Sequence, residues 1–236
     1  MGHAGMNTNQ PLLILVPARS EAEADPLFLQ SIGDCQLIDV TLRDAEALVP
    51  KYDIDLCVTT DDSRVHKYIS DRSTNWNVRM REAAERGGDY FLCLDVARRW
   101  MTSKTGRQYA NVLILEPSHP FRPTGLLENA LGMMRREFDL DTVVSVVAEY
   151  GNIWTEQTDG GLHRLTTPTG KRFFREVAGL CLLTKPATLA SQSAMGRSVG
   201  FVVVEEQWAL IDIHGNSGIE LARQYHSVLT PNLERN

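Results

Sequence analysis

Four apolar runs are spaced along the chain, with segments of helical periodicity after them. The runs lie at residues 12–16, 54–59, 111–115 and 142–147. A strand that is covered on both faces shows a continuous apolar run instead of alternation, so each run predicts a buried strand. Apolar residues at helical spacing in 36–49 and 124–138 predict amphipathic helices between these strands.

The order of these elements predicts the fold class. Strands that alternate with helices and connect by right-handed crossovers produce a mostly parallel sheet between helices. A chain of 236 residues with 43% hydrophobic content can bury one substantial core. We therefore expect a single α/β domain over residues 11–230, with a mostly parallel, Rossmann-like sheet. Residues 1–10 are small and polar and are expected to be a frayed tail.

Two segments depart from this pattern. Between residues 75 and 107, helical spacing at 78–86 and 95–101 flanks a short apolar piece at 90–94. Residues 149–180 contain several glycines and a proline, interleaved with aromatic and basic side chains. This composition predicts an excursion of short strands and turns out of the main sheet.

The charge and the cysteines narrow the function classes. The net charge is −6 and the pI is about 5.5, which disfavours a nucleic-acid binder and a binder of anionic membranes. No run approaches the ~20 apolar residues that cross a membrane. The cysteines are widely spaced without a C-x-x-C pair, so reduced core thiols in a cytoplasmic protein are expected. They are Cys35, Cys57, Cys93 and Cys181.

Polar residues follow several predicted strands directly. Open α/β sheets bind ligands at the carboxyl ends of their strands, and backbone N–H groups that leave the first strand can meet a phosphate. Arg19 follows the first strand, Asp61 and Asp62 follow the second, and Glu116 follows the third. Asp61, Asp62 or Ser63 can also cap a helix that begins near residue 64, and this interpretation is favoured for them.

Segments in the same order along the chain resemble the cytidylyltransferases that activate sialic acid, Kdo and related acidic sugars. Pro17, Ala18, Arg19 and Pro26 have the spacing of the family's P-A-R-G-G-S-K-G-I-P opening. Residues 36–42 resemble its P-L-I-x-x-T-I helix. Residues 115–122, LEPSHPFR, match L-Q-P-T-S-P-L-R without a gap, and 212–222, DIHGNSGIELA, match D-I-D-T-P-E-D-L-E-L-A. The R-P motif that holds the base has only Cys93-Leu94 as its nearest match.

The resemblance implies an enzyme that transfers CMP from CTP to an acidic, nonulosonic-type sugar and releases pyrophosphate. It places the phosphates against Pro17, Ala18 and Arg19 and against the amides of Ser20 and Glu21. Arg19 and Asp212 are the expected catalytic residues. CTP and a small acidic sugar are the expected partners.

The resemblance also implies a divalent cation. The family holds Mg²⁺ with two aspartates one residue apart, and here Asp212 and His214 stand in these positions. Imidazole binds Mn²⁺ better than Mg²⁺, so Mn²⁺ is an alternative ion. Glu116 completes the expected metal set of Asp212, His214 and Glu116. The other interpretation of His214 is a turn residue that caps the last helix.

Five side chains are expected to contact the sugar. They are Glu116, Ser118, Arg122, Arg172 and Arg175. Arg122 could instead belong to a structural ion pair. Related enzymes use an excursion like 149–180 as a dimerisation arm that carries basic residues into the neighbouring site. The resemblance therefore implies a homodimer, and a basic solvated turn remains the alternative for Arg172 and Arg175.

One position reverses the charge expected by the family. Glu23 stands where the family has a lysine near the triphosphate. Two like charges ~4 Å apart at an effective dielectric of ~20 repel each other by about 4 kcal/mol. Two alternatives therefore stay open: a family member that binds a nucleotide or a partner protein without catalysis, and a nucleotidyltransferase that acts on a different acceptor.

Overall fold

The computed structural model describes residues 11–19, 26–72, 74–85, 88–137, 139–151, 153–165, 173–193 and 195–233. At residues 84 and 229–233 it describes the backbone but not the side chains. The tail expected at 1–10 lies outside the described residues.

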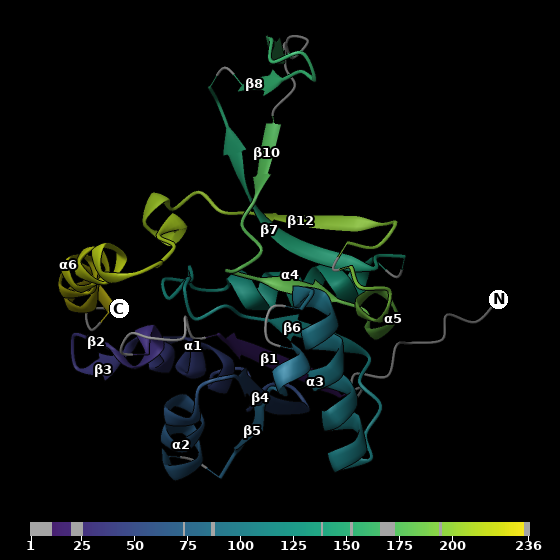
Figure 1. The fold of residues 1–236 in the computed structure, drawn as a ribbon, viewed down its shortest axis with the longest axis vertical. Helices are drawn as coiled ribbons and strands as arrows, with labels where there is room; N and C mark the ends of the chain where they lie inside the picture. The colour runs from purple at the N-terminus through teal and green to yellow at the C-terminus, as the bar shows by residue number, and fades with distance from the viewer. Residues whose placement is uncertain are drawn as a thin grey trace.

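An eight-stranded sheet forms the centre of the molecule (Figure 1). Its strands are β1 (Leu12–Ala18), β4 (Ile54–Thr60), β5 (Trp76–Met80), β6 (Asn111–Ile114), β7 (Thr142–Glu149), β10 (Phe173–Glu176), β11 (Leu182–Thr184) and β12 (Val199–Val203). The order is β10-β7-β11-β6-β1-β4-β5, and β12 also pairs with β7. Strand β1 runs parallel to β4 and β6, β4 to β5, and β7 to β12, whereas β10 and β11 are antiparallel to their neighbours. The predicted mostly parallel α/β sheet is confirmed.

Helices cover both faces of this sheet. They are α1 (Leu37–Glu46), α2 (Ser63–Arg72), α3 (Tyr90–Thr105), α4 (Leu126–Arg136), α5 (Pro186–Ala190) and α6 (Asn216–Leu233), with short 3₁₀ helices at Leu27–Leu29, Ala83–Glu85 and Gln207–Leu210. Helices α1, α2 and α4 share one apolar core with the sheet, and α3 and α5 share a second core on the opposite face. Strand β1 lies between the two cores, with Ile14 and Val16 in the first and Leu13 and Leu15 in the second. This burial explains its continuous apolar run.

Polar side chains begin the helices that follow the strands. The carboxylate of Asp62 accepts the backbone N–H of Arg64 at 2.8 Å and starts α2, as the N-cap interpretation predicts. The backbone N–H of Gln36 donates to Asp39 at 3.1 Å in a capping box that starts α1. The Asp62 cap therefore lies where the chain leaves the carboxyl end of β4, and the capping box lies where α1 follows the β2–β3 hairpin.

The helix predicted at 78–86 is wrong. Residues Trp76–Met80 form the edge strand β5, which pairs in parallel with β4. Long-range pairing decided this segment against its local periodicity. The apolar piece at 90–94 and the helix at 95–101 are instead one helix, α3, whose buried Leu94, Ala97 and Met101 face the sheet.

Two small hairpins lie outside the main sheet. Strands β8 (Ile153–Glu156) and β9 (Leu162–Leu165) pair with each other and stand beyond the ends of β7 and β10 (Figure 1). The predicted excursion of short strands is therefore present. Strands β2 (Ser31–Ile32) and β3 (Cys35–Gln36) form the second hairpin, beside α6.

All four cysteines are buried and free, as predicted for core thiols. Burial raises the pKa of Cys57 and of Cys181 to about 12. Among the described residues, no helix is long and apolar enough to cross a membrane.

Candidate functional site

The carboxyl ends of parallel strands bring several predicted residues to one edge of the sheet. Pro17 and Ala18 end β1 and pair with Thr59 and Thr60 of β4. Arg19 follows them and is exposed. The predicted phosphate-binding residues Ser20 and Glu21, together with Glu23, lie outside the described residues.

Arg81 is a basic residue at this edge that the sequence analysis missed. It follows β5, and its backbone N–H donates to Thr60 O at 2.7 Å. Burial lowers the pKa of its guanidinium, and the nearby charge of Asp61 partly offsets this effect. Arg19 also lies close enough to interact with it electrostatically. Recognising 76–80 as a strand would have placed Arg81 at a ligand-binding edge.

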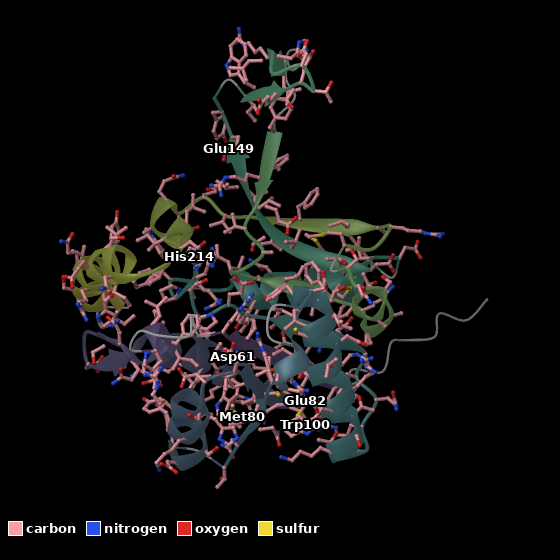
Figure 2. All side chains as sticks on the ribbon, in the orientation of Figure 1. Asp61, Met80, Glu82, Trp100, Glu149 and His214 are labelled. Carbon is pink, nitrogen blue, oxygen red and sulfur yellow. The ribbon has the colours of Figure 1, made fainter. Side chains whose placement is uncertain are left out.

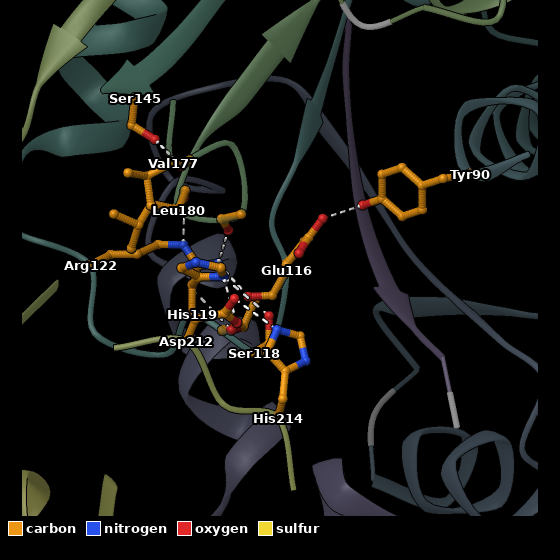
Figure 3. Close-up of polar contacts among 12 residues, drawn as sticks. Tyr90, Glu116, Ser118, His119, Arg122, Ser145, Val177, Leu180, Asp212 and His214 are labelled. Carbon is orange, nitrogen blue, oxygen red and sulfur yellow. Dashed lines mark hydrogen bonds and ion pairs between the residues drawn. The ribbon is translucent and has the colours of Figure 1, made fainter. Parts of the chain in front are cut away.

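Glu116 lies at the carboxyl end of β6, where it contacts α3. Tyr90 Oη donates a hydrogen bond of 2.6 Å to Glu116 Oε1 (Figure 3). Burial, together with the charge of Glu116, raises the pKa of Tyr90 well above its ordinary value. The contact holds the Glu116 carboxylate in one orientation at the edge of the sheet.

The Asp212 loop packs directly on the loop after β6 (Figure 3). The backbone N–H of Ile213, whose side chain is fully buried, donates to Ser118 O at 2.8 Å. This anchor places Asp212 between two imidazoles. His214 Nε2 lies 2.8 Å from Asp212 Oδ2, and His119 Nδ1 lies 3.5 Å from Asp212 Oδ1. The predicted Asp212–His214 pair is therefore formed.

His119 is a second residue that the sequence analysis missed. Its Nδ1 is 3.1 Å from Ser118 Oγ, and both residues are buried. A Cβ atom added to Gly179 would lie 2.2 Å from His119 Nδ1, so the ring occupies the space left by this glycine. The position of His119 depends on a glycine in a distant loop, and hydrophobic periodicity does not reveal such a contact.

The predicted metal set is only partly assembled. Asp212 and His214 are in contact, whereas Glu116 is held by Tyr90. Within the described chain, the three donor groups do not come within 4.8 Å of one another. A carboxylate beside imidazole nitrogens fits Mn²⁺ or Zn²⁺ better than Mg²⁺, which prefers oxygen ligands.

A hollow lies beside these loops. It has a volume of about 760 Å³ and is open to solvent. Its lining residues are Pro26, Leu29, Gln30, Ser31, Arg64, Asn216, Glu220 and Arg223. None of the predicted site residues lines it, although Asn216 follows His214 closely and Pro26 ends the predicted phosphate-binding segment.

Comparisons with known proteins identify this architecture. No protein-family model and no curated protein sequence matches the chain. Among solved structures, 4-diphosphocytidyl-2C-methyl-D-erythritol synthase from Anaerococcus prevotii has a TM-score of 0.64 at 13% identity, over 93% of this chain and 99% of that one. CMP:2-keto-3-deoxy-manno-octonic acid synthetase, complexed with CTP, has a TM-score of 0.63 at 14% identity, over 94% and 100%. A further 4-diphosphocytidyl-2C-methyl-D-erythritol synthase has a TM-score of 0.63 at 13% identity, over 92% of this chain and 99% of that one.

The chain shares the fold of these solved cytidylyltransferases.

Within the cytidylyltransferase fold of this chain, Arg122 holds loops together. Its side chain is 2% exposed. It donates from Nε to Leu180 O, from Nη1 to Thr41 Oγ1 and Asp44, and from Nη2 to Glu116 O and Gly179 O, at 2.8–3.3 Å. These five bonds occupy its five N–H groups. The structure therefore supports the structural alternative for Arg122 over sugar binding.

Of the other expected sugar contacts, Ser118 lies beside the Asp212 loop, whereas Arg175 lies on another part of the sheet. Ser118 is buried against His119. Arg175 lies on β10, where its Nε donates to Glu149 Oε1 at 2.8 Å, and both side chains are exposed. The outer ends of β7 and β10 and the β8–β9 hairpin form a projecting arm, and Figure 2 shows Glu149 on it, away from Asp61 at the sheet edge. Arg172 lies outside the described residues.

His119 predicts a pH dependence of stability. Burial lowers the pKa of His119 below its ordinary 6.5, and the charges of Asp212 and Glu116 partly offset this shift. The folded protein then binds fewer protons at this site than the unfolded chain, so the contribution is complete above pH 6.5 and is lost as the pH falls below it. We expect His119→Asn to flatten the decline in unfolding free energy between about pH 7 and pH 5, measured by urea denaturation. The exposed His163→Asn is the control, and identical slopes in wild type and His119→Asn would contradict the prediction.

Proposed function

We propose that the chain is a CTP-dependent cytidylyltransferase that transfers CMP to the hydroxyl group of an acidic sugar. The observation that carries the proposal is the meeting of Arg19, Arg81, Glu116 and the Asp212 loop at one edge of a sheet with the cytidylyltransferase fold. One solved structure with this fold is named as a synthetase that joins CMP to an acidic sugar, 2-keto-3-deoxy-manno-octonic acid. Another is named as a synthase of a cytidyl derivative of methylerythritol.

In the proposed reaction, the acceptor hydroxyl oxygen attacks the α-phosphorus of CTP. The bond to pyrophosphate breaks, pyrophosphate leaves with the electron pair, and the hydroxyl proton passes to a base. Glu116, a partly exposed carboxylate oriented by Tyr90, is the proposed proton acceptor. Arg19 and Arg81 stabilise negative charge on the phosphates.

Asp212 and His214 are the residues proposed to hold a divalent cation. When bound, such an ion neutralises charge on the triphosphate. The contact of Asp212 with His214 and its approach to His119 fit an ion that accepts nitrogen ligands, so Mn²⁺ is preferred over the Mg²⁺ that the family resemblance implies.

The experiment that tests this function measures pyrophosphate release by the purified chain with CTP and Mn²⁺ or Mg²⁺. The acceptors are a panel of nonulosonic acids, Kdo and phosphorylated polyols. Turnover with an acidic sugar supports the proposal, and turnover with a phosphorylated polyol alone would assign a different acceptor. No turnover, together with a rise in melting temperature on adding CTP, would favour the nucleotide-binding alternative.

One observation favours the alternative in which the protein binds a nucleotide without catalysis. Arg122, the expected sugar ligand, is fully used inside the protein, and Glu116 does not join Asp212 and His214 in one cluster. If the protein is the proposed transferase, Arg122 is not available to bind the sugar carboxylate. We propose that Arg172 and Arg175 bind it instead, across a homodimer.

The projecting arm supports a second copy of this chain as its partner. Exposed apolar side chains gather on it and at its base: Tyr150, Trp154, Leu162, Leu165, Phe174, Phe201 and Val203. Phe174 and Phe201 stack with ring centroids 6.2 Å apart. An apolar surface of this kind marks an interaction site more often than free solvent-facing structure.

We expect Leu162→Asp to convert the proposed dimer into a monomer, because Leu162 is 70% exposed on β9 and a buried charge in a dimer interface is costly. Sedimentation velocity measures the change. Val49→Asp is the matched control, since Val49 is also exposed but lies after α1, outside the arm. A wild-type protein that sediments as a monomer over micromolar concentrations would contradict the dimer.

A further inference from the structure

Three side chains with metal-binding atoms meet where the C-terminal helix crosses the β2–β3 hairpin. Asp34 lies in the hairpin turn, Cys35 begins β3, and His226 lies on α6. One carboxylate oxygen, the Cys35 Sγ and one imidazole nitrogen all lie within 4.8 Å of one another. Among the described residues, this is the group of three such side chains that satisfies that spacing.

Helix α6 directs His226 toward the protein. Ile219 and Ala222 are the buried residues between positions 216 and 228, and His226 follows Ala222 by four positions. Residues four apart lie on the same helix face, so the half-buried His226 continues the inward stripe. A polar ring therefore occupies a position where an apolar side chain would extend the packing.

The hairpin turn is shaped to admit this ring. Gly33 has a φ of 61°, in the left-handed region that favours glycine. A Cβ atom at this position would lie 2.3 Å from His226 Nδ1. The absence of a side chain at Gly33 thus lets the imidazole approach the turn that carries Asp34 and Cys35.

The three groups differ in exposure in a way that suits an ion. Cys35 is 7% exposed, with its Sγ 3.6 Å from Ile32 O, His226 is half-buried, and Asp34 is exposed. The thiol and the imidazole form an inner pair, and the carboxylate lies on the side from which an ion can enter.

We propose that Asp34, Cys35 and His226 bind one Zn²⁺ ion, with water as the fourth ligand. Sulfur, nitrogen and oxygen donors together are typical of zinc, whereas Mg²⁺ takes oxygen ligands. Bonds of about 2.0–2.3 Å in a tetrahedral shell separate ligand atoms by roughly 3.5 Å, so atoms that lie within 4.8 Å of one another close by at most about an ångström on binding. Cys35 binds as the thiolate, and its proton passes to solvent.

The bound ion joins α6 to the hairpin near the start of the chain. Over 216–228, helix α6 buries Ile219 and Ala222, and Arg223 Nε donates to Ser31 O of the hairpin at 3.0 Å. The ion therefore acts as a structural clip. This site shares no residue with the proposed CMP transfer and does not depend on it.

Titration of the full chain with Co²⁺ under reducing conditions tests the proposal. A tetrahedral Co²⁺ ion with a thiolate ligand has a near-ultraviolet sulfur-to-cobalt band and visible d–d bands, and Zn²⁺ displaces it. We expect one such ion per chain. Cys35→Ser should abolish the charge-transfer band, and His226→Gln should weaken Zn²⁺ binding roughly 100-fold or more, because each removes one of three protein ligands.

The controls separate this site from others. Cys93→Ser and the exposed His163→Ala should keep the band, and so should Asp212→Asn, because the cation site proposed for CMP transfer has no thiol. Circular dichroism checks that Cys35→Ser is folded, and the conservative Asp34→Asn, expected to lower affinity about tenfold, provides an independent variant. Absence of the band in wild type at saturating Co²⁺, or its persistence in folded Cys35→Ser, would overturn the zinc site.

Discussion

Replacement of Asp212 by asparagine is expected to lower CMP transfer roughly 100- to 1,000-fold, the usual effect of losing a group that stabilises transition-state charge. The variant keeps the shape of the side chain but loses the carboxylate charge that faces His119 and His214. Asp212 is 38% exposed, so folding should be unaffected. Pyrophosphate release with CTP, Mn²⁺ and the best acceptor measures the effect.

Asp71→Asn is the matched control for this prediction, because Asp71 is an exposed carboxylate on α2 whose partner is Lys67. If wild type binds CTP without turnover, the readout becomes the Mn²⁺-dependent shift in melting temperature with CTP, which Asp212→Asn should remove. Wild-type turnover and an unchanged shift in Asp212→Asn would show that the triphosphate and its cation are held elsewhere.

Arg122→Ala is expected to destabilise the protein by about 3–5 kcal/mol, the typical cost of breaking a buried ion pair by removing one partner. The change leaves the backbone carbonyls of Glu116, Gly179 and Leu180 without their donor. It also removes the cation beside Asp44, whose pKa burial already raises to about 6. The unfolding free energy from urea denaturation measures the loss.

Arg175→Ala is the control, because its ion pair with Glu149 is exposed and is worth only about 0–1 kcal/mol. Arg122→Lys should also destabilise, since one ammonium group cannot reproduce the planar set of five donors. An Arg122→Ala variant with wild-type stability and a raised KM for the sugar would instead restore the ligand role implied by the family resemblance.

The sheet was largely predictable from the sequence because its strands are covered on both faces. Burial on both sides selects apolar residues at every position, and that pattern is visible without coordinates in β1, β4, β6 and β7. Strand β5 was not predictable in this way. It lies at the sheet edge, only Trp76 and Arg79 of its residues are buried, and its pairing with β4 is long-range.

The residues of the candidate site also fall into those that the sequence could identify and those that it could not. Arg19, Glu116 and Asp212 could be named from their places after strands and from the family resemblance. Arg81 was missed because β5 was interpreted as a helix. His119 was missed because its environment depends on Gly179, which is distant in sequence. The role of Arg122 depends on carbonyl groups of its own loop and of residues 179–180, and side-chain identity alone does not reveal whether such acceptors are present.

The sequence by itself determined the alternation of buried strands and helices, the excursion of short strands and the residues available at the carboxyl edge. These features are local, because each depends on neighbouring residues and on burial that a pattern records. Only the tertiary structure decided that Arg122 donates to the carbonyls of Glu116, Gly179 and Leu180, that His119 lies beside Asp212, and that His226 lies near Asp34 and Cys35. Those outcomes depend on which distant segments supply acceptors, space and charge, and loop packing settles this after the chain has folded.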